Sequence, residues 1–384
     1  MQKAWLVRLL YFLVFCCTAS WLPVLADFCR SRELSGTETS LILSITPLMM
    51  FLIQPVYGAV ADRFGYKKCL IFSSLLASIS FLGYLLQGSF MLLALVTVMM
   101  SIFYNTIQPV LDSISLKLAA ADPDFSYGTL RTAGAAGWAF TGILTGYVID
   151  GISINAIFII SSASLFLVFL FSFLLKAEHE KMPGSDAFVN TRTIIRDPAL
   201  AFLLLCVFLV STGATTIWNF YSLYMKENGA SATLVGYGLS FQGLCEIPLF
   251  YFSSRIIFKL GLKRTLVLTV MATVIRLLLY SVVGDPVYAL PIELLHGLSW
   301  SLFWVACVEY VSRLVDPAWL ATGQSLLYAA YFGAGAIAGN YWTGWLYDHK
   351  FRLSEIFLLN AGIVMVVAVL LAFFLKTKDR LSVA

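Results

Sequence analysis

Four ionisable side chains lie deep inside apolar stretches of the sequence: Glu246, Arg276, Glu293 and His296. Counted at 1.5 Å per helical residue from one end of each stretch, Glu246 lies about 21 Å deep, Arg276 about 18 Å and His296 about 13 Å. A charged group near the middle of a bilayer is costly unless it is paired or hydrated. Each of these residues is therefore a candidate functional group.

These residue types suit the exchange of protons. An imidazole titrates near neutral pH, and a carboxyl group in a partly dry cavity can titrate in the same range. We predict that Glu246 and Arg276 form a buried ion pair, which protonation of the carboxylate would break. His296 follows Glu293 by one helical turn on the same face. The alternatives are a structural ion pair without proton transfer, a packing role for His296, and a hydrated outer-rim position for Glu293.

Membrane-spanning helices must hold these residues. The chain has 384 residues, of which 60% are hydrophobic and 12% charged, whereas soluble domains are about half apolar. Helices satisfy their own backbone hydrogen bonds in lipid, and the apolar runs lack the alternation of a barrel strand. We expect an all-α fold with twelve spans. They are residues 4–26, 37–60, 69–87, 90–118, 127–149, 153–176, 200–223, 232–257, 264–283, 287–313, 321–347 and 354–376.

One long polar connection divides the chain. Residues 177–199 are polar and contain Pro183 and Gly184. They are predicted to link an N-terminal six-helix bundle, residues 1–176, to a C-terminal one, residues 200–384. The first apolar run could instead be a cleaved signal peptide, because Lys3 and Arg8 precede its apolar core. We favour a helix, because the internal repeat requires it.

The charged residues predict the orientation of the chain. Most of the 25 Lys and Arg residues lie at the termini and in the even-numbered connections. Positive residues are retained on the cytoplasmic side of a membrane, so both termini and the 177–199 linker are expected there. The net charge of +4 does not suggest a nucleic-acid partner.

Cofactor chemistry is not indicated. The seven cysteines are scattered and form no metal-ligand or disulfide spacing, and no phosphate-binding G-x-x-x-x-G-K-S/T motif occurs. We therefore expect no metal, no cofactor and no enzymatic activity. Energy would come from the proton gradient or from downhill flow.

The two halves contain similar short segments. "FGYKKCLI" (64–71) aligns with "LGLKRTLV" (260–267), and "GYVID" (146–150) aligns with "GWLYD" (344–348). The fifth span of each half is also rich in small residues, which let helices approach closely in lipid. Two halves repeated in parallel sense are typical of one large class of transporters.

The segment "GAVADRFGYKK" resembles the signature between helices 2 and 3 of the major facilitator superfamily, G-x-x-x-D-R-x-G-x-K/R-K/R. The resemblance implies the two-bundle fold and alternating access, with a charge network beside helix 11 that stabilises one face of the cycle. The second copy of this segment has Phe258 at the place of Asp62, so only the N-terminal half would contribute such a charge network. The matching residues are Gly58, Asp62, Arg63, Gly65, Lys67 and Lys68.

A finer resemblance concerns helices 4, 5, 10 and 11. Residues 109–119, 127–142, 293–315 and 321–348 resemble a branch of the superfamily. That branch groups lactose-permease-like, nucleoside–proton symporter-like and phenylpropionate-permease-like proteins. The resemblance implies uptake of a sugar, a nucleoside or an aromatic acid together with protons.

The lactose-permease-like pattern has an acid on helix 8, an Arg on helix 9 and a His on helix 10. Glu246, Arg276 and His296 occupy the matching places. The proton-carrying acid of that pattern would fall at Ser299, so carriage would pass to Glu246 or to Glu293.

The N-terminal half supplies further candidates. Asp112 and Arg131 resemble the branch's acid–Arg pair, and their depth favours a cytoplasmic gate over substrate binding; a surface ion pair is the alternative. Asn105 and Gln108 could bond a polar solute or a neighbouring helix.

Aromatic and basic side chains could complete a binding site. Trp138 and Trp300 could stack on a sugar or nucleobase ring, although most helical aromatics pack or lie at interfaces. Arg276 could bind a carboxylate if Glu246 pairs elsewhere.

The sequence therefore predicts a monomeric, multi-pass transporter of the bacterial inner membrane. It would carry a small organic solute by proton-coupled symport. A proton-driven exporter would use the same charges in the opposite sense, and uptake under an imposed pH gradient separates the two. A non-transporting sensor or scaffold would show no solute flux and would tolerate Glu246→Gln.

Overall fold

The computed structural model describes residues 4–86, 88–121, 127–176, 197–315, 323 and 326–375. These residues form helices and connecting turns without a strand, as the all-α prediction requires. Residues 177–196, which make up most of the expected linker, lie outside the described residues.

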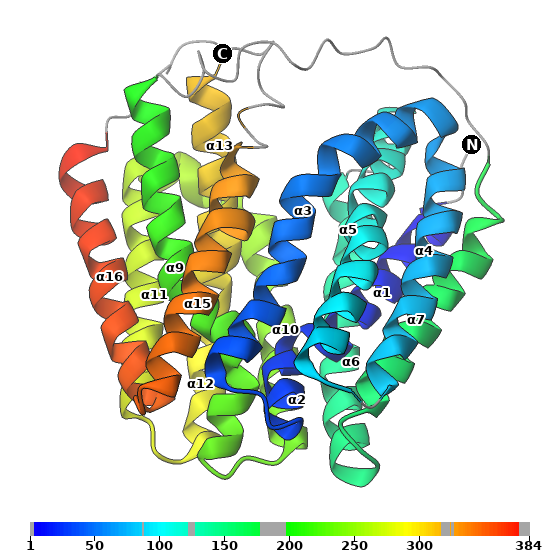
Figure 1. Ribbon diagram of the computed structural model, residues 1–384. Helices are drawn as coiled ribbons and strands as arrows, with labels where there is room; N and C mark the ends of the chain where they lie inside the picture. Colours follow the sequence, from blue (N-terminus) through cyan, green and yellow to red (C-terminus); the bar gives the residue numbers. More distant parts are fainter. Residues whose placement is uncertain are drawn as a thin grey trace. The chain divides into compact units, whose positions relative to one another are not determined.

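The helices of the N-terminal part follow one another with short connections (Figure 1). They are α1 (Ala4–Trp21), α2 (Leu25–Ser31), α3 (Gly36–Phe64), α4 (Tyr66–Leu82), α5 (Phe90–Ala121), α6 (Tyr127–Gly151) and α7 (Ala156–Ser172).

The C-terminal part contains α9 (Pro198–Glu227), α10 (Ala232–Leu260), α11 (Leu262–Val282), α12 (Ala289–Ile292), α13 (Phe303–Leu314), α15 (Ala336–Asp348) and α16 (Leu353–Phe374). Two π-helical segments, Gly297–Leu302 and Ala329–Gly335, precede α13 and α15. Such segments add a residue to a helical turn and are frequent at functional sites.

Each predicted apolar run coincides with a helix or with helical segments joined end to end in the described part of the chain. By length and composition, seven of the described helices can cross a membrane. The count of twelve spans and the cytoplasmic location of both termini stay predictions. The seven are Ala4–Ser31, Tyr66–Leu85, Phe90–Ser115, Pro198–Glu227, Leu262–Val282, Pro286–Leu314 and Leu353–Phe374.

The first run differs from the prediction at its C-terminal end. It was expected to end at residue 26, but a 3₁₀ turn at Leu22–Val24 follows α1, and α2 then extends to Ser31. Pro23 occupies this turn and has no backbone N–H to donate, which explains why the regular helix ends before it.

Residue contacts divide the chain into two compact units. The first contains Met1–Ser185 and Asn219–Leu244, and the second contains Asp186–Trp218 and Cys245–Ala384. The division into bundles of residues 1–176 and 200–384 stays a prediction.

The first unit has an aromatic core. Its α1 packs on α6 and α7, and α4 packs on α5 and α7. Tyr84 stacks on Phe158 at 4.3 Å between ring centroids, and Phe28 meets the same ring edge-on at 4.7 Å. The core therefore joins α2, the 3₁₀ turn Gly83–Leu85 that follows α4, and the start of α7.

In the second unit, α11 packs along α16 and against the helical segments that precede α13. Figure 1 shows α11 beside α16. Tyr280 on α11 contacts Phe357 on α16 with their ring centroids 5.1 Å apart. This packing fixes the helix that presents Arg276.

The repeat predicted from the sequence has a structural counterpart at its turns. Gly65 precedes α4 with φ +90°, and Gly261 precedes α11 with φ +78°. Both values lie in the region that glycine adopts without steric cost. The two aligned segments therefore make the same kind of turn between consecutive helices.

Glycines also allow α6 to contact the first half of α10 within the first unit. A Cβ atom at Gly236 would lie 2.3 Å from the carbonyl oxygen of Gly142, and one at Gly146 would lie 2.6 Å from that of Ala232. These distances leave no room for a side chain. The prediction that small residues in this span permit close helix contact is therefore confirmed for α6.

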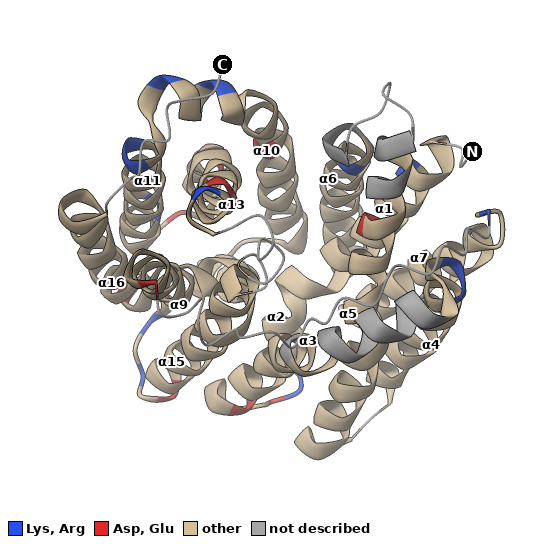
Figure 2. Ribbon diagram, turned by 90° about the horizontal axis from the view of Figure 1, so that it is seen from above, with Lys and Arg blue, Asp and Glu red and all other residues tan. Residues whose placement is uncertain are grey.

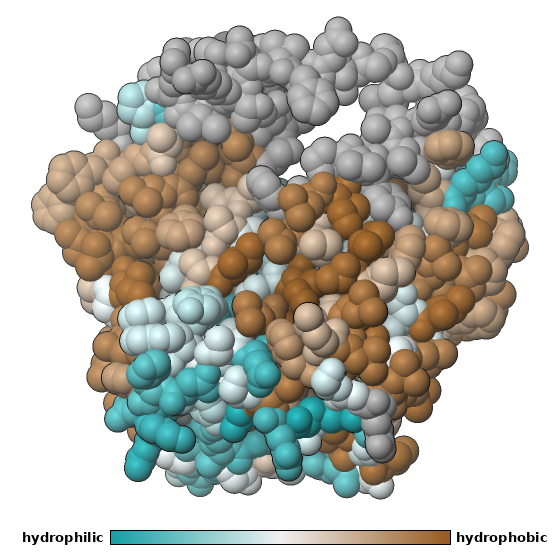
Figure 3. All heavy atoms as spheres, in the orientation of Figure 1, coloured by the Kyte–Doolittle hydropathy of each residue, from teal (hydrophilic) through white to brown (hydrophobic). Residues whose placement is uncertain are grey.

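Many large apolar side chains are exposed on the described part of the chain. Figure 2 shows long stretches of helix without Lys, Arg, Asp or Glu, and Figure 3 shows hydrophobic residues over much of one face. Large side chains such as Phe72, Val282 and Phe373 are 58, 77 and 76% exposed. Such surfaces are compatible with lipid, and the chain is a multi-pass membrane protein.

Candidate functional site

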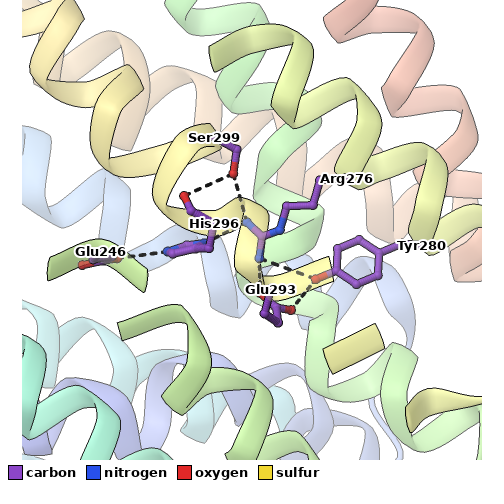
Figure 4. Close-up of polar contacts among 6 residues, drawn as sticks. All are labelled: Glu246, Arg276, Tyr280, Glu293, His296 and Ser299. Carbon is purple, nitrogen blue, oxygen red and sulfur yellow. Dashed lines mark hydrogen bonds and ion pairs between the residues drawn. The ribbon is translucent and has the colours of Figure 1, made fainter. Parts of the chain in front are cut away.

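A buried polar network joins three parts of the second unit (Figure 4). Arg276 comes from the middle of α11 and Glu246 from α10. Glu293 and His296 come from the irregular helix between α12 and α13. All four residues were predicted as a charge network, and the structure brings them together.

The local fold explains why Glu293 and His296 face the same partner. Glu293–Leu295 form a 3₁₀ turn, and His296 follows directly before the π-helical segment. In a 3₁₀ helix the side chains at positions i and i+3 are eclipsed. The two side chains therefore point to the same side, toward α11.

Arg276 is the centre of the network. Its side chain is 3% exposed, and its Nη2 pairs with Glu293 Oε2. Its Nη1 lies 2.8 Å from Nδ1 of His296 and 3.4 Å from the hydroxyl of Ser299. The guanidinium thus uses one amine for the carboxylate and the other for the imidazole.

The contact with Arg276 sets the tautomer of His296. A guanidinium N–H can only donate, so Nδ1 of the imidazole must accept and its proton must lie on Nε2. Nε2 lies 3.0 Å from Glu246 Oε1 and donates to it. His296 is therefore neutral in this arrangement, and a second proton on Nδ1 would require Arg276 to move away.

The two carboxyl groups differ in accessibility. Glu293 is fully buried, whereas 21% of the Glu246 side chain is exposed. With His296 neutral and both carboxylates ionised, the one positive charge of Arg276 leaves the network with one net negative charge. One added proton would neutralise it, and Glu246 is the more exposed of the two acids.

The observed pairing is more specific than the predicted one. A direct Glu246–Arg276 pair was expected, but the link between these residues runs through His296, and Arg276 is paired with Glu293. Glu293 was assigned a possible outer-rim position, but it is buried. Helical depth places residues along the membrane normal, whereas these partners are set by rotation of the helix about its axis.

Sequence reasoning missed Tyr280, whose hydroxyl donates to Glu293 Oε1. Tyr280 is fully buried and lies one turn after Arg276 on α11. The spacing i, i+4 on one helix face was the available signal.

Aromatic rings adjoin the network. Trp218 meets the His296 ring edge-on at 5.0 Å and the Trp300 ring at 5.1 Å. Trp300 belongs to the first π-helical segment and contacts Tyr331 of the second at 5.2 Å. Trp218 and Trp300 are only partly buried. The structure therefore places the sequence candidate Trp300 beside the charge network.

The N-terminal candidates lie in the first unit, where Asn105 and Trp138 have partners. The amide of Asn105 donates to the backbone oxygen of Thr46 at 3.0 Å, so it joins α5 to α3. Gln108 is partly buried on α5. Trp138 packs beside Gly243, where a Cβ atom would lie 3.3 Å from the indole.

The proposed gate residues have contacts within the first unit. Tyr11 donates to Asp112 Oδ1 at 2.6 Å, which joins α1 to α5. The guanidinium carbon of Arg131 lies 5.8 Å from the ring centroid of Phe15. Both residues thus contact α1, and their role as a gate stays a prediction.

The signature loop is partly described. Lys67 donates to the backbone oxygens of Phe173 and Leu175, beyond the end of α7, and Lys68 is exposed. Because carbonyl groups at a helix C-terminus lack intrahelical donors, Lys67 acts there as a cap. The side chains of Asp62 and Arg63 and the surroundings of Gly58 lie outside what the structure describes.

Comparisons with known proteins agree with the fold. The maltose permease of Geobacillus stearothermophilus is 25% identical over 374 residues, which cover 97% of this chain and 94% of the permease. The sucrose permease of Escherichia coli is 25% identical over 397 residues, which cover 96% of this chain and 92% of that permease. The crystal structure of the nucleoside transporter NupG matches with a TM-score of 0.86 at 17% identity, covering 98% of this chain and 100% of that one.

A model of the MFS_1 like family matches residues 4–359, which is nearly the whole chain. The chain belongs to the MFS_1 like family and is a major facilitator transporter, not an enzyme.

Proposed function

We propose that the protein is a proton-coupled symporter of a small sugar. The observation that carries this proposal is the hydrogen-bonded chain from the partly exposed Glu246 through His296 and Arg276 to the buried Glu293. In the proposal, Glu246 takes up the proton. A titratable group inside a membrane protein is typical of proton relays in transporters.

Coupling would work through the hydrogen bond between His296 and Glu246. When Glu246 takes a proton, it loses its charge and becomes a poorer acceptor for the Nε2 proton of His296. The hydrogen bond between Glu246 on α10 and His296, which in turn contacts Arg276 on α11, is then weakened. Symport requires that the carrier reorients with substrate and proton both bound or with neither bound, and this change would make reorientation of the substrate-loaded carrier depend on the proton.

Sugars are the favoured substrate class for two reasons. The relatives named above include maltose and sucrose permeases. The partly exposed rings of Trp218 and Trp300 also offer apolar faces beside hydrogen-bonding groups, which suits a sugar ring. A nucleoside is the second substrate class to test, because of the structural match to NupG.

The remaining sequence predictions are part of this proposal. Asp112 and Arg131 would form the cytoplasmic gate, and Asn105, Gln108 and Trp138 would face the substrate from the N-terminal half. The transporter would lie in the bacterial inner membrane, use no cofactor besides the proton gradient and act as a monomer.

Uptake into proteoliposomes tests the function. The purified protein is reconstituted, an inward proton gradient is imposed, and accumulation of labelled maltose, sucrose, raffinose and uridine is measured. We expect one of the sugars to accumulate and a protonophore to abolish the accumulation. Accumulation that is indifferent to the protonophore would contradict proton coupling, and efflux driven by an inward proton gradient would indicate an exporter.

A further inference from the structure

Tyr280 completes the bonding of Glu293. The tyrosine hydroxyl donates to Oε1 of Glu293, and Nη2 of Arg276 donates to Oε2. Arg276 Nη2 also lies 3.5 Å from the Tyr280 hydroxyl. Tyr280, Arg276 and Glu293 thus form a closed triangle of polar groups in a fully buried part of the second unit.

This triangle restricts Arg276. The guanidinium is planar and its amines point in fixed directions. With Nη2 held by Glu293, the other amine is directed at Nδ1 of His296. A rotation of Glu293 would move Nη2 and, with it, the contact that fixes the imidazole tautomer.

We propose that Tyr280 is a positioning residue of the coupling site, which holds Glu293 as the fixed counter-ion of Arg276 and thereby leaves proton exchange to Glu246 and His296. This inference rests on the proposed function. It assigns different tasks to the two acids: the buried Glu293 orients Arg276, and the accessible Glu246 carries the proton.

The hydroxyl of Tyr280 can be removed without removing its packing. The tyrosine ring lies against Phe357 of α16, and phenylalanine would keep this contact. Tyr280→Phe therefore deletes the hydrogen bond to Glu293 and the longer one from Arg276 Nη2, while the core of α11 and α16 is retained. Tyr84→Phe is a matched control, because Tyr84 is also fully buried and donates one hydrogen bond, to Thr97 at 2.8 Å, in the other unit.

The first measurement compares two modes of transport with labelled maltose in proteoliposomes. We expect Tyr280→Phe to lower accumulation against a gradient about tenfold, the size expected for one hydrogen bond to a charged group, and to change equal-pH exchange less than about twofold. Tyr84→Phe should change the two modes equally. An equal loss of both modes in Tyr280→Phe would mean that Tyr280 only supports folding, and would overturn the proposal.

The second measurement needs no substrate. A protonated imidazole quenches a neighbouring indole, so the fluorescence of Trp218 reports the proton on His296. Each protein and its Trp218→Phe counterpart are titrated over pH in detergent, and the fluorescence of the counterpart is subtracted to give the contribution of Trp218. We expect Tyr280→Phe to shift the midpoint of this titration and to cause no further shift in a Glu293→Gln background.

The two measurements separate the two claims. An unchanged midpoint in Tyr280→Phe, or an equal shift with and without Glu293, contradicts the role of Tyr280 even if the transporter is proton-coupled. A midpoint shift that depends on Glu293 supports the role of Tyr280. If the same protein accumulates neither sugar nor nucleoside under a proton gradient, the proposed function is contradicted while the role of Tyr280 stands.

Discussion

At the scale of single residues, the charge network depends on orientation as much as on identity. The sequence predicts that Glu246, Arg276, Glu293 and His296 are buried charges, because each interrupts an apolar run. It does not predict that His296 stands between Glu246 and Arg276. That arrangement depends on how α10 and α11 are rotated about their axes, which a count of residues along one helix does not give.

Lys67 offers a test of the capping role that the structure gives to a signature residue. Lys67→Met removes the donor to the backbone oxygens beyond α7, so it should lower the free energy of unfolding by about 0.5–1.5 kcal/mol. Thermal unfolding in detergent measures the change. Lys68→Met removes the same charge from the exposed neighbour and should leave the unfolding temperature nearly unchanged. Equal effects of the two substitutions would contradict a cap by Lys67.

At the scale of elements, small residues and helix ends decide which helices meet. The glycine-rich composition of residues 134–146 predicted a close helix contact, and this segment contacts both α1 and the first half of α10. The sequence could not name these partners, because small residues on one helix permit contact with any neighbour. Ser240 strengthens the contact with α10 by donating to the backbone oxygen of Ala139 at 2.6 Å.

The contact between α6 and α10 predicts an effect of bulk. Gly236→Val would place a side chain where the backbone of Gly142 lies, so it should destabilise the first unit. Gly284 is a suitable control, because a Cβ atom there would meet open space and its φ does not lie in the left-handed region. Gly229 is unsuitable, because its φ of +86° would strain any other residue. Gly284→Ala should therefore be tolerated, and unfolding temperatures of both variants check the difference. An unchanged unfolding temperature in Gly236→Val would show that α6 and α10 do not meet here.

Asp150 joins the end of α6 to the start of α10, and its carboxylate makes this contact sensitive to pH. Its carboxylate accepts from the backbone N–H groups of Ala232 and Thr233 at 2.9 and 2.7 Å, at the N-terminus of α10. Burial alone would raise the pKa of Asp150, but hydrogen bonds from Thr233 and Ala232 and the charge of Lys226 lower it below its usual value. A negative charge at a helix N-terminus is also favourable.

The sign of the pH effect follows from this lowered pKa. The stability from Asp150 is present above the pKa of the unfolded chain, about 3.9, and is lost as the pH falls through the lower folded-state pKa. Asp150→Asn should therefore unfold at a lower temperature than the unsubstituted protein at pH 7, and the difference should shrink below about pH 4. Asp285→Asn, which alters only the local bond to Val287, is the control. A difference that does not change with pH would contradict the role of the Asp150 charge.

At the scale of the whole molecule, composition and the repeated turns indicated the fold class before any contact was known. The aligned segments at Gly65 and Gly261 make equivalent turns, which hydropathy and one short motif could predict. The break at Pro23 and the two π-helical segments were not predicted. They arise from local backbone adjustments that leave the apolar composition of a span unchanged.

The account of the whole molecule depends on Glu246 as the group that links proton binding to solute movement. Removing its charge should leave the solute able to exchange across the membrane, because exchange needs no net proton movement. Accumulation needs that movement. The substitution therefore separates coupling from binding and folding.

The most direct measurement is accumulation and exchange of labelled sugar by Glu246→Gln in proteoliposomes under an inward proton gradient. The account predicts that accumulation is abolished while exchange at equal pH continues at a rate close to that of the unsubstituted protein. Accumulation against a gradient that persists undiminished in Glu246→Gln would contradict it.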